Sequence, residues 1–102
     1  MNYSTLFQKI RKHCECGTVK EIDWVLGLLT DSVDLPTTKA IDLYLGQVTA
    51  DEGIRRIEFY LFNGTQIQRN YCTLFFARRN EWSVVNKAYS EGLIDWAQAY
   101  SR

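Results

Sequence analysis

The sequence predicts an all-α protein, and three features of its 102 residues lead to this fold class. Apolar residues recur at helical spacing in nearly every segment. Residues that cap helices stand directly before several of these segments, and glycine stands directly after them. No segment of useful length alternates apolar and polar residues, as a half-buried strand would. We expect a single all-helical domain over residues 1–102, built as one compact bundle or as a short HEAT-like stack of five to six short helices.

Two helices are predicted in the N-terminal part of the chain. Ser4 can cap the first helix, and Gly17 ends it. Thr18 followed by Glu21 is a capping-box pattern that marks the start of the second helix. The apolar positions of this second helix share one face: Ile22, Val25, Leu26 and Leu29.

The next two helices begin at different kinds of signal. Pro36 suits a first turn, because its missing N–H has no intrahelical partner there in any case. Thr49 with Glu52 resembles a second capping box, and Asn63 with Gly64 ends the helix that follows. Acid-first i,i+4 pairs support this fourth helix: Asp51 with Arg55 and Glu52 with Arg56. The third helix places these residues on its apolar face: Ile41, Tyr44, Leu45 and Val48.

Capping signals also mark the C-terminal helices. Thr65 caps the fifth helix, and the next helix begins near Glu81 and ends at Gly92. Asp95 followed by Gln98 is a third capping pattern, and it opens a short final helix. One side of the helix before Gly92 carries these apolar residues: Trp82, Val85, Ala88 and Tyr89.

Composition restricts the class of protein. A formal net charge of zero argues against a protein built to coat nucleic acid, which needs clustered cations. Three cysteines, an odd number, do not make a disulfide framework. The chain begins without the apolar region of a signal peptide and has no apolar run long enough to span a bilayer. We therefore expect a cytoplasmic protein with reduced thiols and no membrane partner.

The stretch His13 to Cys16 resembles a metal-ligand cluster at first sight. Cys14 and Cys16 are separated by one residue, which is closer than the spacing typical of structural zinc sites. A phosphate-binding glycine loop and the common hydrolase motifs are missing from the sequence. We expect no metal, no cofactor and no enzymatic activity.

The fifth helix is apolar around more than half of its circumference, which is typical of a central packing helix. Its remaining side carries a polar stripe at i, i+3, i+4 and i+7: Gln66, Arg69, Asn70 and Thr73. These side chains can hydrogen-bond to a protein partner or to base edges, or can simply be solvated. In a DNA-binding interpretation, residues 51–79 form a helix-turn-helix whose arginines contact phosphates: Arg55, Arg56, Arg78 and Arg79.

These features lead to an expected function and two alternatives. We expect a small helical protein-interaction module without catalysis, which recognises a protein partner or associates with its own copy. One alternative is a helix-turn-helix-like DNA-binding regulator that uses residues 51–79, although zero net charge weighs against it. The other is a small immunity or anti-factor protein that plugs a partner's site.

Overall fold

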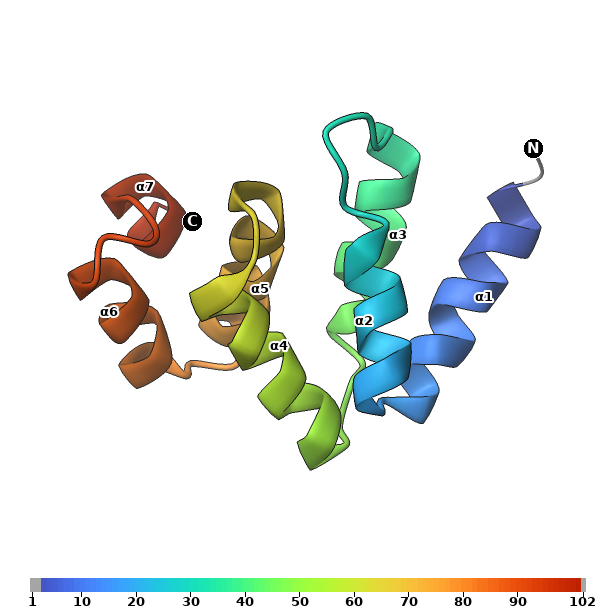
Figure 1. Ribbon diagram of the computed structural model, residues 1–102, viewed down its shortest axis with the longest axis horizontal. Coiled ribbons are helices and arrows are strands. Elements are labelled where there is room, and N and C mark those ends of the chain that lie inside the picture. The colour runs from blue at the N-terminus through green and yellow to red at the C-terminus, as the bar shows by residue number, and fades with distance from the viewer. Residues whose placement is uncertain (1–2, 102) are drawn as a thin grey trace. The chain divides into compact units, whose positions relative to one another are not determined.

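The computed structural model describes residues 3–101, and every regular element in that range is a helix (Figure 1). This confirms the all-α fold class. The described residues form seven helices, more than the expected five or six: α1 (Tyr3–Cys16), α2 (Val19–Gly27), α3 (Leu35–Leu45), α4 (Asp51–Asn63), α5 (Gln66–Arg78), α6 (Trp82–Ser90) and α7 (Trp96–Tyr100).

The helices group into two compact units, and the boundary between Arg56 and Ile57 falls inside α4. In the first unit, α1 packs against both α2 and α3. In the second unit, α5 packs against α6 and α7, and these two helices also contact each other. The single domain over residues 1–102 stays a prediction.

The predicted apolar faces are largely buried, except that Tyr44 is half-buried and that Trp82 and Tyr89 are exposed. In the first unit the core includes these residues, each at most 1% exposed: Ile10, Ile22, Val25, Leu26, Ile41, Leu45 and Val48. In the second unit the buried side chains include Leu61, Cys72, Phe75, Phe76, Val85, Ala88 and Ala99. Side-chain burial of this kind supplies most of the free energy that holds short helices in place.

Most of the predicted helix ends are confirmed. The side chain of Thr18 accepts from the backbone N–H of Glu21 at the start of α2. Complete capping boxes open α5, through Thr65 and Gln68, and α7, through Asp95 and Gln98. Each box satisfies backbone N–H groups that have no partner within the helix. Two glycines with positive φ follow α1 and α6 as predicted: Gly17 at 63° and Gly92 at 74°.

The start of α4 differs from the prediction. The predicted capping box of Thr49 with Glu52 does not form. The helix begins at Asp51, and Glu52 Oε2 accepts instead from the backbone N–H of Val19 at 2.7 Å. Val19 is the first residue of α2, where an unpaired N–H and the positive end of the helix dipole favour a carboxylate.

The expected i,i+4 pair of Glu52 with Arg56 is likewise replaced by longer-range contacts. Arg56 pairs with Asp23 of α2, with Nε to Oδ1 at 2.7 Å and Nη2 to Oδ2 at 3.2 Å. Two parallel bonds between a guanidinium and a carboxylate are stronger than a single exposed i,i+4 contact. Both contacts tie the start of α4 to α2 within the first unit.

Candidate interaction surface

The four residues of the predicted polar stripe all lie on α5, but they do not form one exposed face. Gln66 is exposed, Arg69 and Asn70 are half-buried, and Thr73 is completely buried. The interpretation of these residues as a continuous accessible stripe is therefore corrected. Their use in binding a partner stays a prediction.

Three residues of the stripe bond within the second unit. The Gln66 amide donates to Gln98 Oε1 at 3.0 Å, which connects the start of α5 to α7. Arg69 Nη2 donates to the carbonyl oxygen of Phe62 at 3.3 Å, near the C-terminal end of α4. The hydroxyl of Thr73 donates to the Arg69 carbonyl oxygen at 2.7 Å. The Arg69 bond places a cation near the C-terminal end of α4, where carbonyls without an intrahelical partner attract positive charge.

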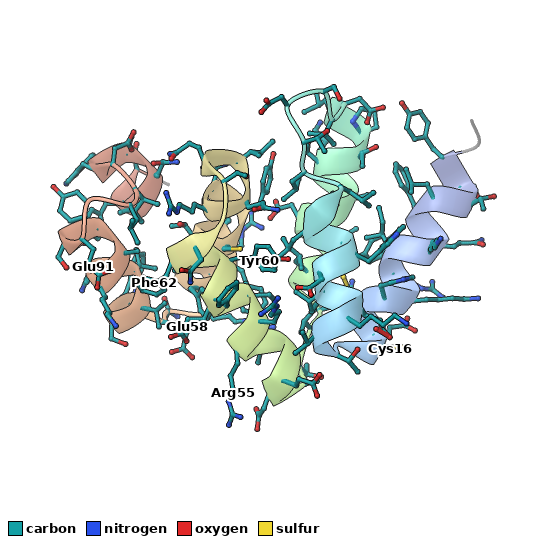
Figure 2. The ribbon with its side chains drawn as sticks, viewed as in Figure 1. Cys16, Arg55, Glu58, Tyr60, Phe62 and Glu91 are labelled. Atoms are coloured by element: carbon teal, nitrogen blue, oxygen red, sulfur yellow. The ribbon has the colours of Figure 1, made fainter. Side chains whose placement is uncertain are left out.

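The four arginines proposed for phosphate contacts occupy different environments. Arg55 is exposed and extends away from α4 (Figure 2). Arg78 is exposed on α5. Arg56 is held by Asp23, and the Arg79 guanidinium lies 4.0 Å from the centroid of the Phe75 ring. Desolvation of Arg79 lowers its pKa. Arg56 and Arg79 are thus engaged by the neighbours named here.

The helix-turn-helix interpretation places α5 as the recognition helix, joined to α4 by a turn at Gly64 and Thr65. A recognition helix has to project so that its side chains reach the major groove. The following residues of α5 are instead buried: Cys72, Thr73, Phe75, Phe76 and Ala77. The helix therefore packs over much of its surface, as its apolar circumference predicts.

The side chains around His13 make local contacts. His13 Nδ1 lies 2.7 Å from the carbonyl oxygen of Lys9, and its ring packs 4.2 Å from the Trp24 ring. Cys14 is buried, which raises the pKa of its thiol to about 12, whereas Cys16 is exposed at the end of α1 (Figure 2). Within residues 3–101, no three His, Cys, Asp or Glu side chains group closely enough to hold a metal ion.

The second unit carries a feature that sequence reasoning missed, which we call the aromatic surface. It consists of four rings on two helices: Trp82 and Tyr89 of α6, with Trp96 and Tyr100 of α7. Trp82 is 39% exposed, Tyr89 is 40% exposed and Trp96 is 60% exposed. The Tyr100 ring contacts the other three, with centroid distances of 6.4 Å to Trp82, 5.4 Å to Tyr89 and 6.1 Å to Trp96.

The spacing of α6 explains how its two rings reach the surface. Trp82, Asn86 and Tyr89 follow one another at i, i+4 and i+7, so they share one side of the helix. Val85 and Ala88 lie next to them around the helix and are completely buried. The four apolar residues therefore lie along one broad side of α6, of which the neighbouring helices cover Val85 and Ala88 and leave Trp82 and Tyr89 exposed at the margin.

Contacts across the second unit fix the position of α7. The Tyr100 hydroxyl donates to Asn86 Oδ1 at 2.5 Å, which secures the ring against α6. At the other end, Gln98 Oε1 accepts from the backbone N–H of Asp95 at 2.9 Å and from the amide of Gln66. A helix of five residues has little stability of its own, so these contacts determine where its rings lie.

A pocket of about 650 Å³ adjoins the aromatic surface. Two of the four rings form part of its wall, and its lining consists of Leu74, Ala77, Arg78, Trp82 and Tyr100. Arg78 is the charged residue of this lining. A concave site with apolar walls and one positioned cation is suited to hold a side chain or peptide segment that combines apolar and anionic groups.

A second, smaller pocket lies in the first unit. It has a volume of about 330 Å³ and is lined by Phe7, Pro36, Lys39, Ala40, Leu43 and Tyr44. Leu43 is 59% exposed there. Its lining contains fewer groups that could orient a ligand than the pocket beside the aromatic surface.

A comparison of the chain with protein families, with curated proteins and with solved structures finds no match. None of the helices formed by residues 3–101 combines the length and apolar character that crossing a bilayer would require.

Proposed function

We propose that this protein is a helical interaction module without catalytic activity, which recognises a partner protein through the aromatic surface. The observation that carries the proposal is the exposure of three of its four rings beside an open pocket. Tryptophan, tyrosine and arginine are enriched at the energetic centres of protein interfaces, and the pocket combines all three types. Leaving such rings in water is unfavourable, so covering them on binding releases free energy.

Duplex DNA fits these features less well as a partner. Its backbone affinity depends on many simultaneous contacts from lysine and arginine. Arg56 and Arg79 already contact Asp23 and Phe75, and the formal net charge of the chain is zero. The buried residues of α5 also leave it little surface with which to enter a groove.

The proposed cellular setting is the cytoplasm. Cys14, Cys16 and Cys72 are all free thiols, and Cys16 is exposed. Unpaired cysteines are common in proteins of reducing compartments, where thiols stay reduced.

Site-specific photocrosslinking in living cells tests the proposal. A photoreactive amino acid replaces Trp96, and in a matched strain it replaces Leu43, because these two side chains are exposed to nearly the same extent, 60% and 59%. We expect a discrete covalent adduct with a protein from position 96 and none of the same mass from position 43. An adduct between two copies of this chain would identify self-association.

Two outcomes would count against the aromatic surface as the interface. Position 96 could give no adduct under conditions in which the protein is folded and abundant. Alternatively, a specific adduct could arise from position 43 alone, which would transfer the interface to the pocket of the first unit.

A further inference from the structure

We infer that the pocket of the first unit binds a small aliphatic carboxylate of medium chain length, with its alkyl chain between α1 and α3 and its carboxylate beside Lys39. This pocket has a volume of about 330 Å³ and is lined by Phe7 of α1 and by five residues of α3. All six residues belong to the first unit, so the aromatic surface of the second unit plays no part in the site.

One face of α3 forms most of the pocket wall. The five lining residues of this helix follow one another at i, i+3, i+4, i+7 and i+8: Pro36, Lys39, Ala40, Leu43 and Tyr44. Phe7 adds a wall from α1, which packs against α3. The Tyr3 hydroxyl donates to Asp34 Oδ2 at 2.6 Å, and the Tyr3 ring lies 5.4 Å from the Phe7 ring. These contacts hold the first turns of α1 beside the start of α3 and thereby position Phe7.

The walls and the volume determine the apolar part of the ligand. Leu43 is 59% exposed, and covering a large aliphatic side chain on binding is favourable. Burial of this kind has no preferred direction, so a flexible alkyl chain suits walls that combine aliphatic and aromatic side chains. Small-molecule sites have volumes of about 300–1,000 Å³. The pocket lies at the lower end of this range, which favours a chain of medium length over a long one.

Charge complementarity determines the polar end of the ligand. Lys39 is the charged residue of the lining, and no carboxylate belongs to it. Lys39 is exposed and makes no ion pair within residues 3–101. Asp34 precedes the lining by two residues, but Tyr3 donates to its Oδ2, and the backbone N–H of Thr37 donates to its Oδ1 at 3.0 Å. A lysine keeps its ammonium group in water while its aliphatic stem lies along an apolar wall, so it matches a ligand with an alkyl chain and one terminal anion.

Other classes of ligand fit this pocket less well. The polar side-chain groups of its lining are the Lys39 ammonium and the Tyr44 hydroxyl. A bound peptide segment would need partners for several backbone N–H and C=O groups. Nucleic acid would need many cations along its backbone, and the lining supplies one. A single charge at the end of an apolar pocket instead corresponds to a ligand with a single anionic group.

The test is an NMR titration of the isotope-labelled chain with octanoate, at concentrations below those at which octanoate forms micelles. We expect saturable shifts that are largest at the amides of Phe7, Ala40 and Leu43. Octanamide has the same chain without the charge, and it should bind about two- to fivefold more weakly, which is the usual contribution of an exposed ion pair. Butyrate should lose up to about fourfold in affinity for each buried methylene group that is removed.

Lys39→Met removes the charge and keeps an apolar stem, so its affinity for octanoate should fall to that of wild type for octanamide. Lys12→Met is the matched control, because it changes the net charge equally and because Lys12 is exposed on α1 outside the lining. Its affinity for octanoate should equal that of wild type. Lys39→Glu should reverse the preference and bind octylammonium more tightly than octanoate. This gain of binding cannot result from misfolding.

Contrary results would be equally clear. Equal affinity for octanoate and octanamide, or equal losses in Lys39→Met and Lys12→Met, would show that Lys39 does not select an anion and would overturn the carboxylate site. Octanoate that does not saturate the shifts would exclude the site altogether. Larger shifts at Trp96 than at Leu43 would show that octanoate adheres to any exposed apolar side chain, which also contradicts a dedicated pocket. The role of the aromatic surface is decided separately, by crosslinking from position 96.

Discussion

Replacing Gly53 with alanine should destabilise the first unit, although glycine-to-alanine changes within helices usually stabilise. Gly53 lies in the first turn of α4, and an added Cβ would stand 2.5 Å from the carbonyl oxygen of Gly17 and 3.0 Å from Val48 Cγ1. The closer atom belongs to the backbone, which cannot rotate away as a side chain can. The positive φ of Gly17 further limits how this turn adjusts.

The two opposing effects can be compared in size. Alanine gains about 0.5–1 kcal/mol over glycine inside a helix, and less in the first turn. Inserting an atom into a filled site costs about 1–3 kcal/mol, and a 2.5 Å contact belongs in the upper part of that range. We therefore expect Gly53→Ala to lower the free energy of unfolding by about 1–2 kcal/mol.

Gly27→Ala is the matched control for this prediction. Gly27 is the last residue of α2, and a Cβ built there meets no atom within 4 Å. The free energy of unfolding of Gly27→Ala should be equal to that of wild type or higher by up to about 1 kcal/mol. Denaturant unfolding followed by circular dichroism gives the midpoints and slopes of both variants. The steric reasoning would be refuted if Gly53→Ala unfolded at the same denaturant concentration as wild type or at a higher one.

Three further predictions concern the second unit and the thiols. Arg69→Ala should lower the free energy of unfolding by about 1 kcal/mol, because losing the bond to the Phe62 carbonyl outweighs releasing the buried, unpaired Nε; denaturant midpoints check this, and a value equal to wild type would contradict it. Iodoacetamide at mildly alkaline pH should modify exposed Cys16 and spare buried Cys14 in the folded protein, as peptide mass spectrometry would reveal. Because burial raises the pKa of Cys14 from 9.0 to about 12, its contribution to stability is complete below pH 9 and is lost as pH rises toward 12.

The helix ends were predictable because their signals are local. Thr65 accepts from the backbone N–H of Gln68 only three residues away, and Asp95 accepts from Gln98 at the same spacing. Gly92 adopts the positive φ that its position after a helix indicates. Such contacts depend on the chain's local conformation, and sequence spacing describes that conformation directly.

Choices between distant partners were not predictable in the same way. Glu52 bonds to Val19, and Arg56 bonds to Asp23, each across 33 positions of the chain. The spacing of residues along one helix cannot show whether a side chain bonds to a distant or to a local partner, because it contains no information about neighbouring helices. Thr73 shows the same limit, since its place in a polar stripe does not reveal that its hydroxyl is buried and bonded to the Arg69 carbonyl.

The aromatic surface depends on which helix covers which side. Periodicity correctly places apolar residues along α6, but it does not tell how far the covering helices extend around it. Val85 and Ala88 are covered, whereas Trp82 and Tyr89 remain exposed at the margin and contact Tyr100 of α7. The sequence feature that indicates this surface is the wide apolar arc of α6, because the arc is broader than the face that the neighbouring helices bury.

If the aromatic surface binds a partner as proposed, the short length of α7 makes this recognition sensitive to a local equilibrium. The helix has five residues and is held by the Asp95–Gln98 box, by Gln66 and by the Tyr100 contact with Asn86. If α7 detaches, Trp96 and Tyr100 leave α6 together, and the binding-competent form disappears without unfolding of the remaining helices. The apparent dissociation constant then equals the intrinsic constant divided by the fraction of molecules with α7 attached. A substitution that removes the hydrogen bonds of Gln98 would accordingly weaken the binding of a ligand that does not contact this residue. A bound ligand would in turn slow amide hydrogen exchange throughout α7.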